Sequence, residues 1–367
     1  MKALILAAGK GERLNLFTGR LPKPLLRVAN HPILGHVIDR SVDCGLDEIV
    51  VVVGGRRQRL LEGFLEEVSS ASGISVVSVT QENPRGTGDA VLAARDAVAD
   101  EHFLLVYGDL FFDDTVLPRL ITMARKGQTA GAMTVSAMKD VSQYGSVNIS
   151  DGKVVSIAEK EGTGPGFANC GIYVLPLEIF DELERLEKSP RDEYEITSAL
   201  NSLTQKRTLA CLRIGRNRWM DVGRPWDLLQ ANLRALGSVG QKARPSLSGS
   251  IRPVILGEDV VVGDGSTIGP YTVLEDQVVV EAGCRIARSI VMKGAHIGRE
   301  CSILRSVVGR GARVGRGTRT RVVPTSPIRA TSGGRTFDLG MRRIGAFVGG
   351  DVRIEPHTTL QPCQLVG

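Results

Sequence analysis

The 367-residue chain has few aromatic side chains, 4% of the total, and no long apolar run. No apolar segment approaches the roughly 20 residues that span a bilayer, and the apolar opening Ala3–Ala8 is too short for the core of a signal peptide. The six cysteines lie far apart without a CxxC pair, which favours buried thiols over a zinc site. Collagen is excluded because there is no Gly-X-Y period, and disorder is excluded because 42% of the residues are apolar. We therefore expect a cytoplasmic, globular protein that does not bind a membrane.

Charge and glycine are unevenly distributed along the chain. Residues 1–240 hold 28 basic and 30 acidic residues, whereas residues 241–367 hold 18 basic and 10 acidic ones. The second region also has 19 of the 43 glycines, but its only aromatic residues are Tyr271, Phe337 and Phe347. At about 150 residues per domain, this length corresponds to about two domains. We predict a first domain over residues 1–236, a polar linker over 237–250 and a second domain over 251–367.

Apolar runs typical of buried strands alternate with amphipathic segments between Lys2 and Lys126. The expected strands are Lys2–Ala8, Asp47–Val53, Ser75–Thr80 and Phe103–Tyr107, and the expected helices are Pro32–Cys44, Arg57–Val68, Asp89–Ala99 and Val116–Lys126. This alternation predicts an α/β fold with a Rossmann-like, mostly parallel sheet and helices on both faces. In such sheets ligands bind beyond the carboxyl ends of the strands, so functional residues should follow strands.

The loop after the first expected strand is rich in small residues. Residues 7–14 read Ala-Ala-Gly-Lys-Gly-Glu-Arg-Leu, and Gly9 and Gly11 would let backbone N–H groups approach a phosphate closely. The loop is not the dinucleotide fingerprint GxGxxG, because leucine stands in place of the third glycine. Downstream, Lys23 lies between two prolines, which stiffen the backbone and limit where its ammonium group can reach. An ordinary glycine-rich turn and a solvated lysine are the alternatives.

Three further loops contain polar residues suited to ligand binding. Gln81 precedes Gly86 and Thr87, and its amide offers one donor and one acceptor, which suits the imide edge of uracil or thymine. A guanine edge, with two donors in a row, would favour a carboxylate. Asp109 follows a buried strand, where a carboxylate is costly without a cation or metal partner, and Asp221 is a second such residue. Each of these residues could instead be a helix cap or a turn residue.

Taken together, these segments resemble the sugar-1-phosphate nucleotidyltransferases, also called nucleotide-sugar pyrophosphorylases. The match is closest to the two-domain type, which includes glucose-1-phosphate thymidylyltransferases and bifunctional sugar-1-phosphate nucleotidyltransferase/acetyltransferases. The family often has proline where this chain has Glu161, which leaves the geometry of that loop open. The segments that carry the resemblance, in the family's order, are Leu6–Leu14, Pro22–Pro24, Gln81 with Gly86 and Thr87, Tyr107–Asp109, Tyr144 with Gly145, Glu159 with Lys160, Asn169–Tyr173, Asp192–Thr197 and Trp219–Gly223.

The resemblance implies that a sugar-1-phosphate oxygen attacks the α-phosphorus of a nucleoside triphosphate and that pyrophosphate leaves in line. Because the nucleophile is already an anion, positioning and charge neutralisation are the main tasks. The implied catalytic residues are Arg13, Lys23 and Lys160, and the implied Mg2+ ligands are Asp109 and Asp221. The nucleotide would contact Leu6, Ala8, Gly9, Gly11, Gln81, Gly86 and Thr87. The sugar would contact Tyr107, Gly145, Glu159, Asn169 and Glu195.

Beyond the linker, an apolar residue recurs at about every sixth position, which neither the helix period nor the strand period explains. Small residues mostly lie two positions before it, and glycine often follows. This period fits a triangular parallel β-helix, whose narrow interior has little room for aromatic rings. The pattern resembles the left-handed β-helix of hexapeptide-repeat proteins, with residues 322–345 as an inserted loop. The recurring residues are Val262, Ile268, Leu274, Val280, Ile286, Val291, Ile297, Ile303, Val308, Val314, Val348, Ile354 and Leu360.

The sequence leaves the role of this second domain open. A structural role in a homo-oligomer, a trimer or a multiple of one, is favoured. The alternative is acetyl transfer from acetyl-CoA with a histidine base, for which His296 and His357 are the candidates, although no convincing His/Asn-containing segment of such enzymes is present. Nucleic acid is not an expected partner, because no aromatic residues are interleaved with the basic ones. A run of arginines could bind phosphate groups or form solvated corners: Arg299, Arg305, Arg310, Arg313, Arg316, Arg319 and Arg321.

We therefore predict a Mg2+-dependent enzyme that transfers a nucleotidyl group from an NTP, with UTP or dTTP favoured, to a sugar 1-phosphate. The products are an NDP-sugar and pyrophosphate. In one alternative the β-helix also acetylates an aminosugar phosphate. In another the chain is a non-catalytic regulatory or scaffold homologue, against which the presence of Arg13, Lys23, Asp109, Lys160 and Asp221 argues.

Overall fold

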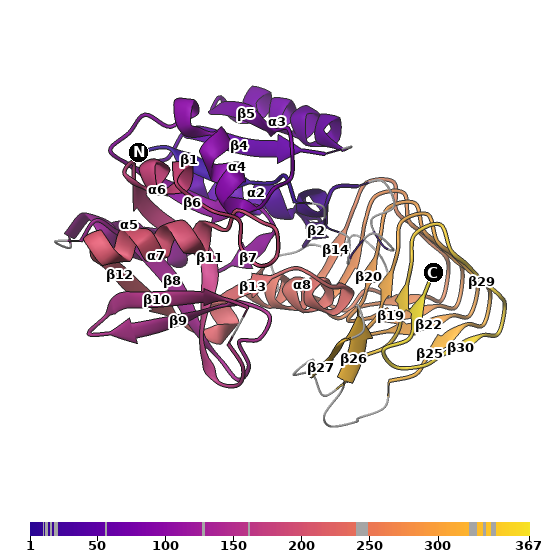
Figure 1. Cartoon of the computed structure of the whole chain (residues 1–367). Helices are drawn as coiled ribbons and strands as arrows, with labels where there is room; N and C mark the ends of the chain where they lie inside the picture. The colour runs from indigo at the N-terminus through magenta and orange to yellow at the C-terminus, as the bar shows by residue number, and fades with distance from the viewer. Residues whose placement is uncertain are drawn as a thin grey trace. The chain divides into compact units, whose positions relative to one another are not determined.

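The computed structural model describes the chain except residues 10, 12–13, 15–16, 18–20, 56, 127–128, 161, 240–248, 323–328, 333–334 and 339–342, and the side chains of residues 239, 329–332 and 335–338. The chain forms two units that interleave in sequence. The first unit contains Met1–Lys10 and Ile33–Asp221, and the second contains Gly11–Pro32 and Val222–Gly367. Figure 1 shows the elements of each unit, coloured along the chain. Two parts of the predicted first domain, residues 11–32 and 222–236, thus belong to the second unit.

A nine-stranded sheet forms the centre of the first unit, in the order β5-β4-β1-β6-β11-β8-β12-β10-β9. Strands β5, β4, β1 and β6 are parallel to one another, whereas β11 and β10 run opposite to their neighbours. The predicted α/β class and mostly parallel sheet are confirmed, with these two reversed strands added. The bounds are β1 (Ala3–Leu6), β4 (Glu48–Gly54), β5 (Ser75–Gln81), β6 (His102–Tyr107), β8 (Gly131–Met138), β9 (Gly145–Ser150), β10 (Lys153–Glu159), β11 (Gly166–Pro176) and β12 (Leu209–Ile214).

The expected strands and helices of this unit are all present, close to their predicted bounds. The expected helix Asp89–Ala99 differs most, because α4 already begins at Thr87 and gives way after Ala93 to a 3-10 turn, η3 (Arg95–Ala97). Gly86 precedes α4 with a φ of 124°, a conformation that glycine adopts readily and other residues do not. The helices are α2 (Ile33–Val42), α3 (Gln58–Ser72), α4 (Thr87–Ala93), α5 (Val116–Lys126), α6 (Ile179–Glu184) and α7 (Ile196–Lys206).

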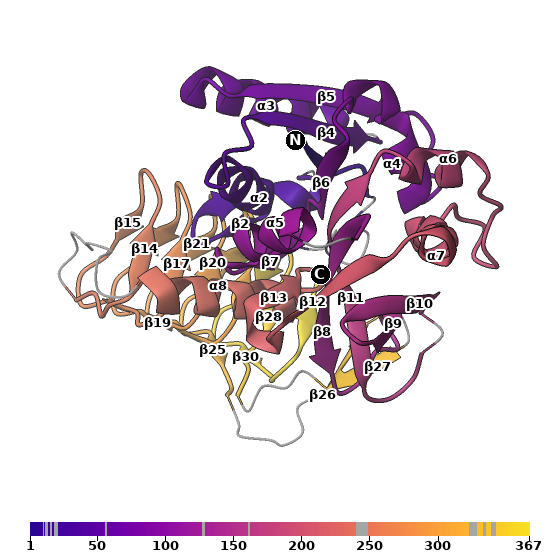
Figure 2. The same ribbon diagram turned by 90° about the vertical axis from the view of Figure 1, so that its left-hand side faces the viewer.

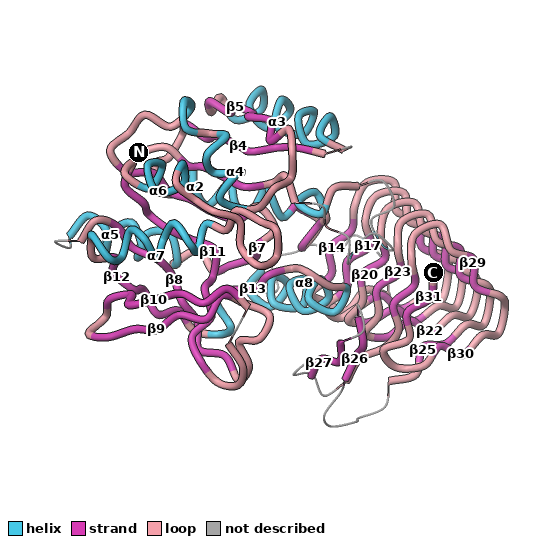
Figure 3. Tube along the Cα trace, viewed as in Figure 1, coloured by secondary structure: helices cyan, strands magenta, loops and turns pink. Residues whose placement is uncertain are grey.

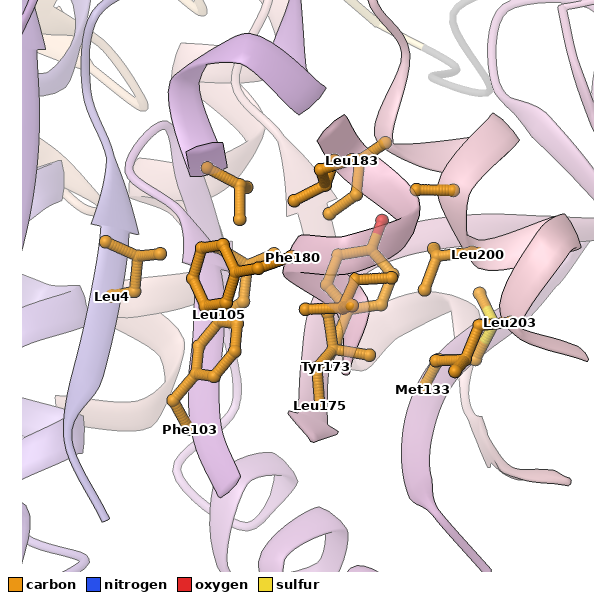
Figure 4. Packing of buried hydrophobic residues seen from close by; sticks show 14 of the residues in the cluster. Leu4, Phe103, Leu105, Met133, Tyr173, Leu175, Phe180, Leu183, Leu200 and Leu203 are labelled. Carbon is orange, nitrogen blue, oxygen red and sulfur yellow. The ribbon is translucent and has the colours of Figure 1, made fainter. Parts of the chain in front are cut away.

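Helices cover both faces of this sheet. Figure 2 shows α4, α6 and α7 on one side of the central strands and α2 and α5 on the other. This arrangement explains the continuous apolar runs, because a strand covered on both faces buries every side chain. On the α4 side, Phe103 of β6 stacks on Phe180 of α6, with 5.5 Å between ring centroids, and Leu105, Tyr173 and Leu200 pack in the same cluster (Figure 4).

Three parallel sheets of very short strands form the β-helix of the second unit, and Figure 3 shows these strands stacked in successive coils. The period-six residues are buried, except that Val262 is partly exposed, so the hexapeptide pattern is confirmed. The first sheet contains β14 (Val254–Leu256), β17 (Thr272–Leu274), β20 (Ile290–Val291), β23 (Val307–Val308), β28 (Phe347–Val348) and β31 (Leu365–Val366). The second contains β15 (Val261–Val262), β18 (Val279–Val280), β21 (His296–Ile297), β24 (Arg313–Val314) and β29 (Arg353–Ile354). The third contains β16 (Thr267–Ile268), β19 (Arg285–Ala287), β22 (Ser302–Leu304), β25 (Arg319–Thr320) and β30 (Thr359–Leu360).

The small residues that precede each buried apolar position link one coil to the next. Ser289 and Ser306 are almost completely buried. The Ser289 hydroxyl accepts a hydrogen bond from the Ser306 backbone N–H at 3.1 Å, and the Ser306 hydroxyl accepts one from Ala346 N–H at 3.0 Å. A larger side chain would not fit here, and an apolar one would leave these buried N–H groups without a partner. In the inserted segment after β25, β26 (Arg329–Ser332) and β27 (Arg335–Asp338) pair antiparallel.

The second unit also contains a long helix and the segment that follows the first glycine-rich loop. The helix is α8 (Pro225–Val239), and the segment contains the 3-10 turn η2 (Lys23–Leu25) with the paired strands β2 (Arg27–Val28) and β3 (His31–Pro32). Cysteines 170, 211, 284 and 301 are buried thiols, as predicted, whereas Cys44 and Cys363 are only half-buried. None of the helices in the described parts of the chain is long and apolar enough to cross a membrane.

Candidate active site

Predicted nucleotide-binding residues meet at the carboxyl ends of three parallel strands in the first unit. Leu6 ends β1 opposite Tyr107, the last residue of β6, and Gln81 ends β5 opposite Gly54. A Cβ atom on Gly54 would lie 2.8 Å from the Gln81 carbonyl oxygen and 3.3 Å from the Ala8 Cβ, so these backbones approach one another closely. This is the edge at which an α/β sheet binds its ligands.

The Gln81 side chain is held by its own unit. Its Nε2 donates hydrogen bonds to the Gly86 carbonyl at 3.1 Å and to Asp89 Oδ2 at 2.7 Å. Arg85 donates to the other oxygen of Asp89 through Nε at 3.0 Å and a terminal nitrogen at 2.6 Å. Both amide hydrogens of Gln81 are therefore engaged, which leaves its Oε1 as an acceptor for a ligand. From the sequence, the Gln81 amide could present either a donor or an acceptor to a ligand. No sequence pattern indicated that Asp89 and Arg85 fix its orientation.

Gly86 and Thr87 pack against the segment before α7. A Cβ atom on Gly86 would lie 2.5 Å from the Tyr194 carbonyl oxygen, so only glycine fits. Gly88 N–H donates to the same carbonyl at 2.7 Å, and the Thr87 hydroxyl accepts from Ile196 N–H at 3.1 Å. These contacts connect the loop after β5 with the residues that lead to Glu195.

Four of the charged side chains around a pocket of about 720 Å³ lie close together. Glu159 ends β10, and its Oε1 lies 3.5 Å from Lys160 Nζ and 3.6 Å from the Arg191 guanidinium. The same guanidinium lies 3.0 Å from Glu195 Oε1. Burial, followed by the charge of Glu159, raises the pKa of Glu195. The structure thus brings together the predicted site residues Glu159, Lys160 and Glu195, and Arg191, which no sequence motif indicated, lies beside them.

Gly145 and Asn169 border this charged group. A Cβ atom on Gly145 would lie 2.9 Å from Glu159 Oε2 and 3.4 Å from the Asn169 Cβ. Asn169 Oδ1 accepts hydrogen bonds from the Tyr173 hydroxyl at 2.9 Å and from Gly171 N–H at 3.1 Å. Tyr107 packs against Tyr173 with 6.1 Å between ring centroids, and burial raises the pKa of the Tyr107 phenol. All five residues predicted to contact the sugar therefore belong to one region of the first unit.

The two predicted metal ligands lie at a pair of short strands, Asp109 just before the first and Asp221 at the end of the second. Strand β7 (Leu110–Phe112) directly follows Asp109, and β13 (Trp219–Asp221) pairs with it so that Asp221 lies opposite Leu110. Among the described residues no group of three or more His, Cys, Asp or Glu side chains could hold a metal. Two carboxylates nevertheless fit Mg2+, which usually binds one or two carboxylates together with phosphate oxygens and water.

The remaining residues that are predicted to bind phosphate belong to the second unit, apart from Gly9. Gly9 has open space beside its Cα, since among the described residues, its chain neighbours aside, no atom lies within 4 Å of an added Cβ. Gly11 has a φ of +62°, and a Cβ there would lie 2.9 Å from the Lys23 Cβ, so the glycine lets the two backbones approach. Lys23 begins η2, between the two prolines. Arg13 and Glu161 lie outside the described residues.

The two candidate acetyltransferase histidines lie apart on the β-helix. His296 is on β21, and its Nε2 lies 3.0 Å from Glu281 Oε1. His357 is exposed at a coil corner, where it has a φ of 60°. Six members of the arginine run are exposed, whereas Arg305 is half-buried. Burial, together with the charges of Arg288 and Arg343, lowers the pKa of Arg305.

Sequence comparison assigns the family. A nucleotidyl transferase family model matches residues 2–238, well over half of the chain, and a model of the GMPPB C-terminal domain matches residues 250–366. The chain belongs to the nucleotidyl transferase family.

More specifically, its relatives are sugar-1-phosphate nucleotidyltransferases, as the sequence motifs predicted. The chain is 29% identical over its whole length to a bifunctional sugar-1-phosphate nucleotidylyltransferase/acetyltransferase of Sulfurisphaera tokodaii, of which it covers 94%. It is 30% identical to the bifunctional protein GlmU of Methanocaldococcus jannaschii, over 81% of this chain and 74% of that protein. A solved structure described as that of a glucose-1-phosphate thymidylyltransferase from Bacillus anthracis, in complex with a sucrose, is similar with a TM-score of 0.58 and 26% identity, over 63% of this chain and 94% of that one.

Proposed function

We propose that this chain transfers a nucleotidyl group from UTP or dTTP to a sugar 1-phosphate. One oxygen of the sugar phosphate forms a bond to the α-phosphorus of the NTP, the bond to the β-phosphate oxygen breaks, and pyrophosphate leaves. The observation that carries this proposal is the cluster of Glu159, Lys160, Arg191 and Glu195 around one pocket. Carboxylates accept hydrogen bonds from sugar hydroxyls, and the two cations can neutralise a phosphate, so the cluster suits both ends of a sugar phosphate.

The proposed roles follow from charge and position. Lys160 and Arg191 would hold the sugar phosphate, while Glu159, Glu195 and Asn169 would orient the sugar hydroxyls. Arg13 and Lys23 would neutralise the triphosphate, with backbone N–H groups near Leu6, Ala8, Gly9, Gly11, Gly86 and Thr87 as further donors. Asp109 and Asp221 would hold Mg2+, which, when bound, neutralises phosphate charge.

The bonding of Gln81 supports a limited set of bases. Its free Oε1 can accept a hydrogen bond from the imide N–H of uracil or thymine. Guanine also has a ring N–H at this edge, whereas adenine and cytosine present a ring acceptor that would face Oε1 unfavourably. We therefore expect the uracil and thymine triphosphates to be used, with GTP ahead of ATP and CTP.

A pyrophosphate-release assay tests this function. The full chain with Mg2+ is given each of UTP, dTTP, GTP, ATP and CTP together with glucose 1-phosphate or an N-acetylhexosamine 1-phosphate. Release that depends on both substrates supports the proposal and identifies the pair. No release from any pair would favour the non-catalytic homologue instead.

Acetyl transfer is the second candidate function. The observation in its favour is the pair of His296 and Glu281, because a carboxylate 3.0 Å from an imidazole can orient it as a general base. Thiol release from acetyl-CoA with glucosamine 1-phosphate, lost in His296→Ala, would support it. His357→Ala is the matched comparison, because His357 is an exposed residue at a coil corner.

The β-helix is also the proposed site of self-association, as a trimer or a multiple of one, in a cytoplasmic enzyme. The supporting feature is an exposed apolar strip: Val261 and Val279 lie opposite each other on β15 and β18 and are 57% and 36% exposed. Light scattering on the full chain would give the number of subunits. A monomer at micromolar concentration would contradict this part of the proposal.

A further inference from the structure

The segment that contains Lys23 is part of the β-helix unit. Residues 11–32 lie between β1 and α2 in sequence, yet they group with residues 222–367. In the proposed function this segment supplies Gly11, Arg13 and Lys23 to the triphosphate. Whatever fixes the segment therefore influences the position of these groups.

An ion pair joins the segment to a coil of the β-helix. Arg27 lies two residues after the end of η2 and donates to Asp276 Oδ2 at 2.7 Å across 249 positions of sequence. Asp276 follows β17 at a coil corner, where its Oδ1 also accepts from Glu258 N–H at 3.2 Å, and Lys293 Nζ lies 3.7 Å from Oδ2. Burial raises the pKa of Asp276, but the hydrogen bonds from Arg27 and Glu258 outweigh it and lower the pKa overall. The carboxyl group is therefore ionised, and its bond with Arg27 is charge-assisted.

A buried amide holds the backbone next to this ion pair. Asn232 of α8 is 1% exposed. Its Oδ1 accepts from Ala29 N–H at 2.9 Å, and its Nδ2 donates to the Arg27 carbonyl at 3.3 Å. Ala29 and Asn30 form the tight turn between β2 and β3, with φ angles of 52° and 62°. Arg27 is thus fixed at both its backbone and its guanidinium.

A third contact is aromatic. Phe17, in the same segment, packs edge-on against Phe347 of β28 with 6.4 Å between ring centroids, and Trp226 of α8 packs against Phe347 at 6.2 Å. Phe347 is one of only three aromatic residues between 241 and 367, and it is fully buried. Phe347 of the β-helix thus contacts the segment before Lys23. Asp276 of the β-helix contacts the segment after Lys23.

We propose that Asp276 of the β-helix is a positioning residue for nucleotidyl transfer, because through Arg27 it fixes the segment that carries Lys23. The inference rests on the proposed role of Lys23. Asp276 acts through another residue and does not itself contact substrate. Removal of its charge should loosen the segment and weaken the contacts with the triphosphate, while the sugar-binding cluster of the first unit keeps its own ion pairs. The β-helix would then serve the reaction in addition to any role in assembly.

The test compares the full-length chain with Asp276→Asn, Arg27→Gln and the double variant. The control is Asp264→Asn, an exposed aspartate at an earlier corner of the β-helix. We expect amide hydrogen exchange of residues 21–32 to become faster in the first three variants, with the β-helix strands unchanged. We also expect KM for the NTP to rise about tenfold and KM for the sugar 1-phosphate to stay within about twofold. The double variant should match the single ones, because each substitution removes the same interaction.

Unchanged exchange in residues 21–32 would overturn the inference. So would equal increases in both KM values, which indicate a general loss of structure, or additive effects in the double variant. If Asp276→Asn does not fold, Arg27→Gln provides the same test from outside the β-helix. If the wild-type chain releases no pyrophosphate, the proposed function and the positioning role both fail. The exchange result would still show whether Asp276 anchors the segment, so the two failures are distinguishable.

Discussion

The two units place their charged side chains differently. In the first unit Arg191 lies between Glu159 and Glu195, with Lys160 beside them, so opposite charges surround one pocket. On the β-helix, Arg313 lies opposite Arg353 on the neighbouring strand, both exposed, and like charges at such positions repel. Charges gathered around a pocket suit a charged ligand, which can replace the ion pairs between the side chains. Charges spread over exposed faces chiefly keep the β-helix soluble. The basic excess of residues 241–367 is therefore largely a surface property.

Asp276 is an exception to this division. It is on the β-helix, but it is mostly shielded from solvent and paired with Arg27, as a site residue of the first unit would be. Its neighbour Glu275 is 7% exposed, and its Oε2 accepts a hydrogen bond from Lys293 N–H at 3.0 Å. In either unit, paired charges therefore lie at positions where the local geometry has to be fixed.

The largest expected effect concerns the proposed metal ligands of the first unit, Asp109 and Asp221. Asp109→Ala should lower pyrophosphate release by about 1,000-fold, since loss of a metal ligand removes several kcal/mol of charge stabilisation in the transition state. Asp96→Ala, an exposed aspartate on η3, is the control and should leave the rate unchanged. The measurement is kcat at saturating Mg2+. A normal rate in Asp109→Ala would exclude this residue as a metal ligand.

The next effect tests the buried acid of the β-helix. Burial, with a smaller contribution from the charge of Asp276, raises the pKa of Glu275 from 4.5 to about 7. The hydrogen bond from the Lys293 backbone N–H and the charges of Arg27 and Arg310 lower the pKa, but by less. Because the folded pKa exceeds the unfolded one, the folded state binds more protons between these values, and stability falls as the pH rises through this window. At about 1.4 kcal/mol per pKa unit, the loss between pH 4.5 and pH 8 is about 3 kcal/mol.

Glu275→Gln should remove this loss. Relative to wild type, the variant should gain stability on going from pH 5 to pH 8, as measured by urea unfolding followed by circular dichroism. Glu300→Gln, an exposed corner residue, is the control and should show no such trend. A stability difference between Glu275→Gln and wild type that does not grow over this range would contradict the assignment.

A third, smaller effect tests the pocket cluster. Arg191→Ala should raise KM for the sugar 1-phosphate about 30-fold, or about 2 kcal/mol, because a charge-assisted contact with phosphate is lost. Arg185→Ala is a matched control, because Arg185 lines the same pocket but lies near Glu182 at 3.8 Å. An equal change in both variants, or a rise in KM for the NTP instead, would contradict the role of Arg191.

The fold could be predicted from the sequence because its signals are local. Continuous apolar runs predict strands covered on both faces, and a period of six predicts coils of short strands. Both patterns are formed by residues that are close together in the sequence. The reversed direction of β11 was not predictable in this way, since it depends on its pairing with β6 and β8. The membership of residues 11–32 in the second unit depends likewise on contacts such as Arg27 with Asp276, which no local pattern reveals.

The site was predictable where residues follow strands. Gln81, Tyr107 and Glu159 end β5, β6 and β10, so their grouping follows from the strand pattern. Arg191 was missed because it lies in an irregular segment before α7; its spacing of four residues from Glu195 was the available signal. The bonding of the Gln81 amide could not be foreseen either, because it depends on where α4 begins and thus on where Asp89 lies.

The smallest expected effect concerns that amide. Asp89→Asn should free Gln81 to rotate, because the carboxylate that accepts its N–H and pairs with Arg85 is lost. A rotated amide can present a donor as well as an acceptor, so the preference for bases with a ring N–H should weaken. We expect the ratio of kcat/KM for UTP or dTTP to that for CTP to fall about fivefold, or about 1 kcal/mol.

Asp96→Asn should leave the ratio unchanged. An unaltered ratio in Asp89→Asn, with Gln81→Ala lowering it, would show that Gln81 selects the base without help from Asp89. An unaltered ratio in both variants would show that Gln81 does not recognise the base. The ion pair of Arg85 with Asp89 would then only stabilise the beginning of α4.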